Sequence, residues 1–269
     1  MNTNTTPEIT RPFAVVTGAS SGIGFELAKQ FAEHGFDLLI NSEDSHLAGA
    51  AEQLRLTGAD VQELQMNLRT YDGVEDLYTA IRADGRPVAA AALNAGVGQG
   101  GAFLDISLAA DLEIIELNVT STVHLAKRLL HDMADRDEGR VLITSSLAST
   151  MPGSFQAVYN ASKSFLQSFG EALQNELKDT GVTLTILMPG PTDTNFFHRA
   201  EMDDTKIGQG GKDDPAQVAE QGYKALMADK DKLVAGSAKT KAQGLANKIL
   251  PDSLKAEAHR KMVEPGSGQ

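Results

Sequence analysis

The chain has 269 residues and a net charge of −12, and it contains no cysteine. This length suits one large domain or two small ones, and 41% hydrophobic and 22% charged residues are ordinary proportions for a globular protein. The negative charge disfavours nucleic acid and anionic membranes as partners. The lack of cysteine excludes disulfides, thiolate catalysis and cysteine-ligated metal.

The N-terminus and the distribution of apolar residues indicate a protein outside the membrane. Residues 1–10 are polar and lack the apolar core of a signal peptide. No apolar run approaches the roughly 18 residues that span a bilayer. We therefore expect a disordered leader over residues 1–10, followed by a soluble, cytoplasmic protein with no membrane partner.

Strand-like and helix-like segments alternate along the chain. Apolar, β-branched runs predict strands, and apolar residues at helical spacing predict helices. The predicted strands are 13–16, 37–40, 61–66, 140–146 and 182–188, and the predicted helices are 22–34, 48–56, 74–81, 108–133 and 159–178. Residues 88–93 are short and wholly apolar, and their composition suits a strand or a helix. Nearly continuous apolar strands between helices indicate one α/β domain whose parallel sheet is covered on both faces.

The last third of the chain is less regular. Residues 191–214 are polar, contain glycines and have no clear period. A loop of this length in a compact domain is usually functional or disordered, so we expect it to be poorly ordered without ligand. A helix at 215–227 and a short strand at 233–236 end a domain that spans residues 11–236. Residues 237–269 are predicted to form a weakly helical extension with a flexible tail.

A glycine-rich turn, TGASSGIG at 17–24, lies between the first predicted strand and the first predicted helix. Its three glycines permit a sharp turn, close approach to a pyrophosphate and packing of the helix against the sheet. The helix N-terminus offers free N–H groups to the phosphates. A turn without ligand is the alternative, but the strand–turn–helix context favours a dinucleotide site. The residues expected to contact the dinucleotide here are Gly18, Ser20, Ser21, Gly22, Ile23 and Gly24.

Six motifs in the same order and spacing make the chain resemble the short-chain dehydrogenase/reductase family in its single-domain form. The glycine turn reads T-G-x-x-x-G-x-G. The other motifs are LNAG at 93–96, with Leu93 in place of the family's first Asn, Asn118 in the long helix, Ser146 in ITSSLAS, YNASK at 159–163 and PGPTDT at 189–194. The resemblance implies a Rossmann-type doubly wound parallel sheet. It also implies hydride transfer between a nicotinamide dinucleotide and a carbonyl or secondary alcohol substrate, with Asn118, Ser146, Tyr159 and Lys163 as the catalytic residues.

Tyr159 and Lys163 are four residues apart on a predicted helix, so they share a face. To act as a base at neutral pH, a phenol with a pKa near 10 needs a downward shift of roughly three units, about 4 kcal/mol. One ammonium about 4 Å away supplies roughly that energy at an effective dielectric of about 20. We therefore expect Lys163 to lower the pKa of Tyr159 and make it the acid/base. The resemblance implies that Lys163 also binds the nicotinamide ribose.

Ser146 and Asn118 are given supporting roles. The resemblance implies that Ser146 holds the substrate oxygen, and on a strand only one of Ser145 and Ser146 can face the site. It also implies that Asn118 interrupts its helix locally and places a water that relays protons. The alternative for Asn118 is a buried amide satisfied by backbone groups.

Cofactor selectivity is expected at the end of the second strand. The family's usual Asp position falls on Ser42 and its usual Arg position on Glu43, so neither expected residue is present. Glu43 and Asp44 would repel a 2′-phosphate, so the cofactor is NAD or NADP, with NAD favoured. Asn67 occupies the position of a common Asp beside the adenine. The remaining cofactor contacts that the resemblance implies are Leu68, Asn94, Ala95, Gly96, Pro189, Gly190, Thr192 and Thr194.

Apolar residues near the predicted site indicate an apolar ketone or alcohol as substrate. They are Leu147, Met151, Phe155, Phe196 and Phe197. Core packing is the alternative for the last two. Because residues 191–214 begin beside the expected nicotinamide and contain these two rings, we interpret them as a lid that excludes water.

The predicted helices 108–133 and 159–178 contain more apolar residues than one face can bury against a sheet. The surplus residues are Leu125, Leu129, Phe165, Leu166 and Phe169. The resemblance implies that these two helices pair across a two-fold axis, so we predict a homodimer or homotetramer. The histidines show no metal-ligand spacing, so no metal site is predicted. Two alternative functions on the same fold are a non-catalytic, dinucleotide-sensing scaffold and an epimerase.

Overall fold

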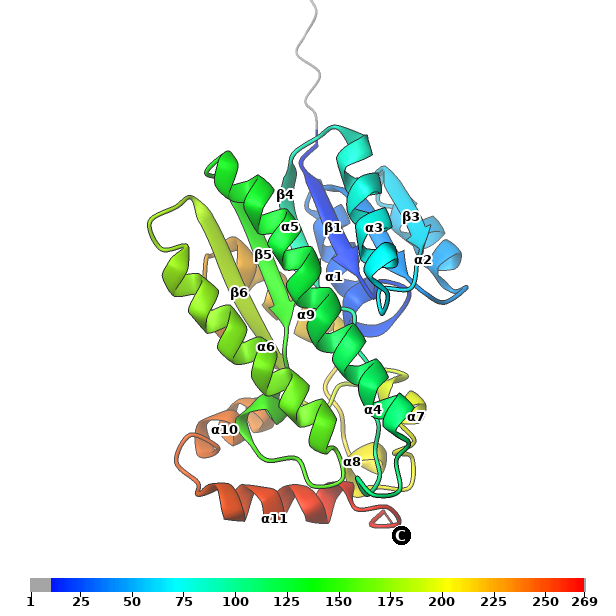
Figure 1. Cartoon of the computed structure of the whole chain (residues 1–269), viewed down its shortest axis with the longest axis vertical. Helices are drawn as coiled ribbons and strands as arrows, with labels where there is room; N and C mark the ends of the chain where they lie inside the picture. Colours follow the sequence, from blue (N-terminus) through cyan, green and yellow to red (C-terminus); the bar gives the residue numbers. More distant parts are fainter. Residues whose placement is uncertain (1–10, 269) are drawn as a thin grey trace, which may run out of the picture.

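Seven parallel strands form one sheet within residues 11–268, the part of the chain that this computed structural model describes. The strand order is β3-β2-β1-β4-β5-β6-β7, and helices cover both faces of the sheet (Figure 1). The strands are β1 (Phe13–Thr17), β2 (Asp37–Ser42), β3 (Val61–Gln65), β4 (Val88–Leu93), β5 (Gly139–Thr144), β6 (Val182–Pro189) and β7 (Lys232–Ala235). The prediction of a Rossmann-type doubly wound sheet in one α/β domain is confirmed. The leader predicted at residues 1–10 lies outside the described residues.

The helices follow the strands in the order that the sequence predicted. They are α1 (Gly22–Glu33), α2 (Leu47–Arg55), α3 (Tyr71–Asp84), α4 (Leu108–Ile114), the π-helical turn η1 (Ile115–Thr120), α5 (Ser121–Asp135), the 3-10 turn η2 (Leu147–Thr150), α6 (Ala157–Glu176), α7 (Phe196–Arg199), α8 (Lys206–Gln209), α9 (Pro215–Met227), α10 (Ala238–Ala246) and α11 (Asp252–Val263). The predicted helix 108–133 is thus one helical run divided by a π-turn. Residues 88–93, left open by composition, form the central strand β4.

Two buried apolar clusters hold the layers together, one on each face of the sheet. Helices α1, α2 and α9 contribute to the first cluster, and α3, α5 and α6 contribute to the second. Successive residues of β1 alternate between them, with Ala14 and Val16 in the first and Phe13 and Val15 in the second. Burial on both faces explains why this strand is apolar throughout.

The order of the strands positions the functional site. The chain winds outward in one direction from β1 to β3 and then returns to place β4 on the other side of β1. In an open parallel sheet, a crevice forms at the carboxyl ends of the strands where this reversal occurs. The loops that follow β1, β4, β5 and β6 therefore meet at one edge of the sheet.

Residues 191–214 differ from the irregular loop that the sequence predicted. They contain the one-turn helices α7 and α8, and their ends are joined by a bridge between Thr192 and Asp213. Phe197 and Met202 are buried in a small cluster that also includes Val263 of α11. Helices of one turn are too short to show a hydrophobic period, and the residues that stabilise them lie far away in the sequence.

The C-terminal tail, predicted to be flexible, contacts this same region. The backbone N–H of Gly266 donates to Asp204 Oδ2 at 2.7 Å, and that of Gly268 donates to the Asp204 carbonyl at 2.9 Å. The Ser267 hydroxyl accepts from the N–H of Lys206 at 3.1 Å. Residues 237–268 therefore lie across the open end of the sheet, where α11 forms the lower edge of the molecule in Figure 1.

The apolar residues proposed for an oligomer interface are only partly exposed. Leu125, Leu129 and Leu166 lie in the core of the chain itself, so the prediction was wrong for these three, because α5 and α6 bury a wider face against the sheet than the pattern suggested. Phe165 is exposed, and so are Phe103, Leu104, Leu108, Leu112 and Ile115 in and just before the helical run that α4 begins. Assembly through these helices stays a prediction.

Two features are absent from residues 11–268: a helix that crosses a membrane and a group of side chains that binds a metal ion. None of the described helices is long and apolar enough to cross a bilayer. In the same residues, no three His, Asp or Glu side chains are grouped so that they could hold a metal ion.

Candidate active site

A cavity of about 220 Å³ lies at the carboxyl edge of the sheet, between the glycine turn and α6. It gathers residues from β1, β2, β4, β5 and β6, together with the segment that contains α7. The sequence-predicted residues that line it are Gly18, Ser20, Ser21, Gly22, Ile23, Gly24, Ser42, Glu43, Leu68, Asn94, Ala95, Gly96, Ser146, Tyr159, Lys163, Pro189, Gly190, Thr192 and Thr194. Asn67 and Asn118 do not line it.

The glycine turn leaves room for a phosphate group at the start of α1. Gly18 and Gly22 have φ angles of +66° and +57°, which favour glycine. A Cβ at Gly24 would overlap the carbonyl oxygen of Gly18. Ser21, the N-cap of α1, makes no side-chain cap to the helix, so the first N–H groups stay free to bind an anion. These features fit the diphosphate of a dinucleotide.

Asn94 connects the ends of strands β1, β4 and β5 beneath the cavity by hydrogen bonds. Its Nδ2 donates to the Thr17 carbonyl at 3.2 Å, and its Oδ1 accepts from the Thr144 hydroxyl at 3.1 Å. The N–H groups of Asn94 and Ala95 donate to Thr17 Oγ1 at 3.0 and 3.1 Å. Thr17 and Thr144, which the sequence analysis did not single out, thereby fix the ends of β1 and β5 against β4.

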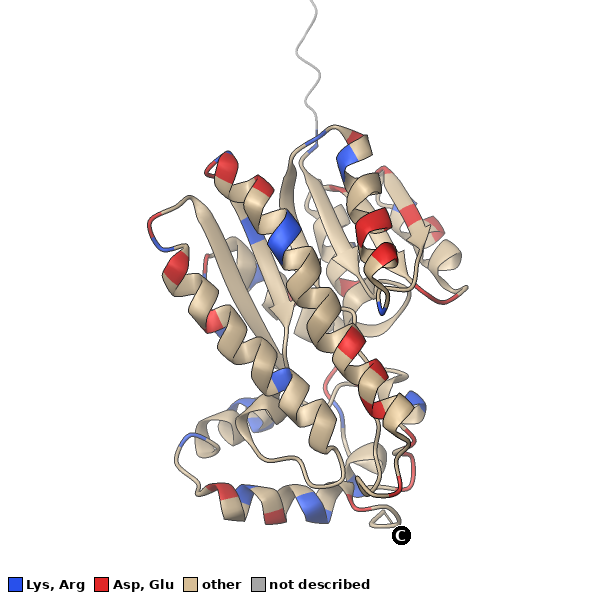
Figure 2. Cartoon of the chain, in the orientation of Figure 1, with Lys and Arg blue, Asp and Glu red and all other residues tan. Residues whose placement is uncertain are grey.

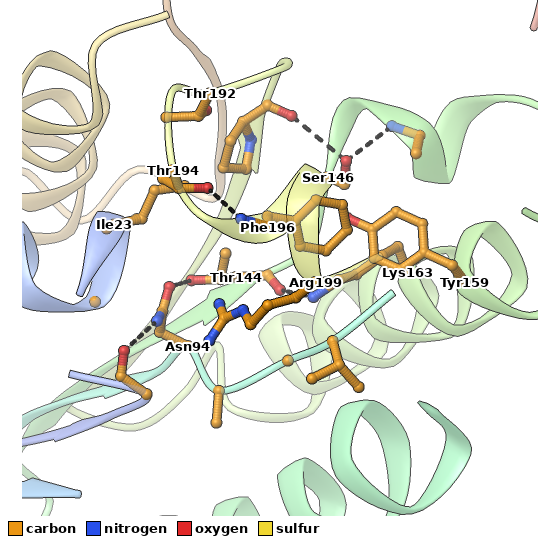
Figure 3. A pocket seen from close by; sticks show the side chains of 18 of the residues that line it. Ile23, Asn94, Thr144, Ser146, Tyr159, Lys163, Thr192, Thr194, Phe196 and Arg199 are labelled. Atoms are coloured by element: carbon orange, nitrogen blue, oxygen red, sulfur yellow. Dashed lines mark hydrogen bonds between the residues drawn. The ribbon is translucent and has the colours of Figure 1, made fainter. Parts of the chain in front are cut away.

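Tyr159 and Lys163 lie one turn apart on α6 and face the cavity with Ser146 (Figure 3). Lys163 is 4% exposed, and its Nζ donates to the Thr144 carbonyl at 2.9 Å. Ser146 Oγ accepts from the N–H of Ala148 at 3.1 Å. The neighbouring Ser145 is turned away, because its hydroxyl donates to the carbonyl of Lys163 at 2.8 Å. One serine therefore faces the site and the other fixes α6.

Asn118 occupies the π-helical turn between α4 and α5 and is fully buried. Its Oδ1 accepts from the N–H of Val97 at 2.9 Å, and its Nδ2 donates to the Val97 carbonyl at 2.9 Å and to Ser162 Oγ at 3.0 Å. A Cβ added at Gly96 would lie 3.1 Å from Asn118 Oδ1 and 3.2 Å from Lys163 Nζ. Asn118 therefore lies in a local interruption of the helix and also has a fully hydrogen-bonded amide, so both interpretations of this residue apply. Its Oδ1 and the Nζ of Lys163 lie next to each other beside Gly96.

The pKa shift of Tyr159 is opposite to the one expected from the sequence. Desolvation raises the pKa of Tyr159 to about 12, although the Ser146 hydroxyl acts in the other direction. Burial lowers the pKa of Lys163 to about 8. The expectation considered only the charge of a nearby ammonium, whereas desolvation has the largest effect on the Tyr159 pKa, and Nζ donates its hydrogen bond to the Thr144 carbonyl. Loss of water destabilises both charges, so at neutral pH Tyr159 is a neutral proton donor.

The far end of the cavity contains a carboxylate held by two serines. Ser20 and Ser42 donate to Asp44 Oδ2 at 2.7 and 2.8 Å. Partial burial acts to raise the pKa of Asp44, but these hydrogen bonds and those from His46 outweigh it and hold the pKa below its ordinary value. Asp44 therefore carries its charge where the sequence predicted the adenosine ribose.

Arg69 interacts with both Glu43 and Asn67 at this end of the cavity. Glu43 forms an ion pair with Arg69, and Asn67 Oδ1 accepts from the N–H of Arg69 at 2.9 Å. Asn67 is exposed and lies outside the cavity. Its side chain thus caps the turn that leads into α3, and a contact between Asn67 and the adenine stays a prediction.

The opposite end of the cavity is apolar. Leu147, Met151, Phe196 and Phe197 line it as predicted, and the Phe196 ring lies 5.2 Å from that of Tyr159 (Figure 3). Phe155 does not line it: its φ is +63°, and its ring packs against Arg260. The apolar pattern around Phe155 could not reveal this turn.

The cavity residues that the sequence did not predict include four from the last third of the chain: Arg199 of α7, Gln243 of α10, and His259 and Met262 of α11. His259 is 3% exposed. Burial lowers its pKa, although a hydrogen bond to the Ser154 carbonyl acts in the other direction. The weak helical pattern of the extension gave no signal that α11 folds back onto the site.

The similarities to known proteins agree with this geometry. Residues 12–205 match the short chain dehydrogenase family. The 3-oxoacyl-(acyl-carrier-protein) reductase FabG of Escherichia coli (strain K12) is 30% identical over 195 residues, which are 72% of this chain and 79% of that protein.

Two solved structures have the same fold. A short-chain dehydrogenase from Sphingobium yanoikuyae in complex with NADPH is 25% identical, has a TM-score of 0.76, and the match covers 89% of this chain and 96% of that one. A short chain dehydrogenase/reductase from Burkholderia phymatum in complex with NAD is 24% identical, with a TM-score of 0.81 and coverage of 96% and 98%. The chain belongs to the short chain dehydrogenase family.

Proposed function

We propose that the chain is an NAD-dependent oxidoreductase that reduces an apolar ketone, or oxidises the matching secondary alcohol, with Tyr159 as acid/base. The observation that carries this proposal is the meeting of Ser146, Tyr159 and Lys163 at one end of a cavity whose other end is the glycine turn. The similarity to FabG, a reductase, and to a dehydrogenase in complex with NADPH supports it. A dinucleotide-sensing scaffold would not need this acid/base group.

The side chains of the site divide the reaction between them. The glycine turn and Asp44 would hold a nicotinamide dinucleotide, which in its reduced form would supply the hydride for the carbonyl carbon. Ser146 holds the substrate oxygen by a hydrogen bond, and the neutral phenol of Tyr159 gives its proton to that oxygen as negative charge develops there. Because desolvation raises the pKa of Tyr159, its resting form is the acid that ketone reduction requires.

The cofactor preference that we propose rests on Asp44. Its carboxylate lines the cavity, is ionised, and accepts hydrogen bonds from Ser20 and Ser42. A carboxylate at this place binds ribose hydroxyls and repels a 2′-phosphate. Arg69, which could attract a phosphate, is neutralised by Glu43. NAD is the cofactor that these charges favour.

The segment 191–214 is proposed as the lid of the site. Phe196 lies against Tyr159, and Thr194 lies against the turn at Gly22. The segment thus touches both the catalytic end and the phosphate end of the cavity. Closing over both would exclude water from the path of the hydride.

Removal of the phenol tests the acid/base role. Tyr159→Phe should lower kcat for ketone reduction by at least ~10²-fold, the low end for general acid/base catalysis, because the phenol is the group that gives its proton to the substrate oxygen in this mechanism. NADH affinity, measured by fluorescence titration, should change little. Tyr71→Phe, at an exposed tyrosine outside the cavity, is the matched control. Retained turnover in Tyr159→Phe would contradict the mechanism.

Neutralising Asp44 tests the cofactor preference. The native chain should have a higher kcat/KM with NADH than with NADPH, and Asp44→Asn should reduce that preference roughly tenfold, since one repulsive charge is removed. Asp60→Asn, an exposed aspartate outside the cavity, should leave the ratio unchanged. A native preference for NADPH would refute this assignment.

Lys163 should reduce stability while it serves catalysis. Its pKa is 10.5 ordinarily and about 8 here, a cost of about 3 kcal/mol at neutral pH. The hydrogen bond to Thr144 offsets about 1 kcal/mol. Since unfolding takes up a proton between these two pKa values, the stability of the native chain should rise with pH across that window.

Lys163→Met should therefore raise the free energy of unfolding by about 2 kcal/mol at neutral pH. The free energy of unfolding of this variant should no longer increase with pH above pH 8. Its activity should be lower than that of the native chain. Urea denaturation as a function of pH measures the first two effects. The exposed Lys230→Met should change neither. A less stable Lys163→Met protein at neutral pH would show that burial does not destabilise the ammonium.

Ligand-dependent hydrogen exchange tests the lid. NADH together with a non-reactive substrate analogue should slow amide exchange and limited proteolysis in residues 191–214, because the segment then closes on both ligands. Amides of α2, which lies outside the cavity, serve as the internal control. Equal exchange of 191–214 with and without ligands would make it a plain surface segment.

A further inference from the structure

The C-terminal extension has a charge opposite to that of the rest of the chain. Residues 237–263 contain six lysine and arginine residues and two carboxylates, whereas the whole chain has a net charge of −12. Figure 2 shows the basic residues along α10 and α11. Residues 238–251 contain three exposed lysines, Lys239, Lys241 and Lys248, and no carboxylate. The next residue, Asp252, is exposed and forms an ion pair with Lys255. In the described part of the chain, no carboxylate pairs with Lys239, Lys241 or Lys248.

The same stretch exposes large apolar side chains. Leu245, Ile249, Leu250 and Leu254 are 63%, 82%, 44% and 57% exposed. Single exposed apolar residues are ordinary, but four within ten residues form a patch of the kind that marks an interaction site. We name as the C-terminal surface the residues Lys241, Leu245, Lys248, Ile249, Leu250 and Leu254.

The shape of this surface is a projecting corner. Lys241 and Leu245 are one turn apart on α10 and share its outer face. The connection from α10 to α11 carries Lys248, Ile249 and Leu250 and protrudes at the lower left in Figure 1. The side chains of α10 and α11 that line the cavity, Gln243 and His259 among them, face the other way.

We propose that the C-terminal surface binds the surface of an anionic lipid bilayer. Apolar side chains interleaved with lysines are the pattern of segments that lie in the membrane interface, where leucine and isoleucine enter the acyl boundary. The lysines would meet lipid phosphates, and each cation close to such a surface raises partitioning by a factor of roughly five. Ile249 and Leu250, at the tip, would enter deepest.

The composition of the surface favours lipid over a protein or nucleic acid partner. Protein interfaces are enriched in aromatic residues and arginine and depleted of lysine, but residues 238–251 contain only lysine as a cation and no aromatic residue. Nucleic acid binding would use the lysines but not the protruding apolar chains. The net charge of −12 does not prevent contact, because charges beyond about 8–10 Å are largely screened at physiological salt.

Vesicle sedimentation with the full chain is the primary test. The protein should sediment with vesicles of phosphatidylcholine that contain roughly one third phosphatidylglycerol, and only weakly with phosphatidylcholine alone. Added salt should reduce the bound fraction. Absence of binding to the anionic vesicles, or equal binding to both compositions, would overturn the proposal.

Two double variants separate the contributions of charge and apolar insertion. Lys241→Gln with Lys248→Gln should lower the partition coefficient roughly twentyfold, and Ile249→Ser with Leu250→Ser should lower it at least roughly tenfold. The matched controls, Lys230→Gln and Leu56→Ser, alter an exposed lysine and an apolar residue that is 87% exposed elsewhere, and should have no effect. Binding that survives both double variants would place the contact elsewhere and overturn the assignment.

A fluorescent label can report insertion directly, because the chain has no cysteine. An environment-sensitive dye on Ile249→Cys should brighten and shift to the blue with anionic vesicles, while the same dye on Leu56→Cys should not. Sedimentation velocity without vesicles tests the alternative that the C-terminal surface binds a second copy of the chain. Self-association that Ile249→Ser with Leu250→Ser abolishes, without vesicle binding by the native chain, would assign the surface to a second copy and overturn the lipid proposal.

Discussion

The ammonium of Lys163, held out of water against the carbonyl of Thr144, is the constraint around which the site is arranged. A buried cation requires a partner and a fixed position. Thr144 supplies the partner, and Ser145 fixes the backbone of Lys163 by its hydrogen bond. Gly96 supplies the space, since a side chain there would press on Nζ. The π-turn at Asn118 brings an amide to the same place.

The sheet makes this local arrangement available to a long ligand. Because all the strands run in one direction, the ends of β1, β4, β5 and β6 open at the same edge. The hydrogen bonds that Asn94 makes to Thr17 and Thr144 set the glycine turn and the catalytic strand at a fixed separation. A ligand with a diphosphate at one end and a reactive ring at the other can therefore contact both ends of one rigid crevice.

Much of the fold, and the meeting of Ser146, Tyr159 and Lys163 at one cavity, could be predicted, because periodic apolar segments and closely spaced motifs are local in sequence. The direction of the Tyr159 pKa shift could not be predicted. The sequence gives the spacing of Tyr159 and Lys163, but it does not show how much water each group loses on folding, and this loss has the largest effect on both pKa values. The positions of Asn67 and Phe155 outside the cavity could not be predicted, because a turn, not an apolar pattern, decides where each side chain points. His259 was missed because α11 returns to the site from far along the chain.

The family match divides the lining of the cavity between two parts of the chain. The match ends at residue 205, and up to there it includes the glycine turn, Ser146, Tyr159 and Lys163. The residues beyond it supply Ile207, Gln243, His259 and Met262 to the cavity. The residues proposed for the chemistry therefore lie within the family match, whereas α10 and α11 line the cavity and also expose lysine and apolar side chains to solvent. Because both helices take part in the cavity and in the outer surface, a substitution that shifts either helix would alter both.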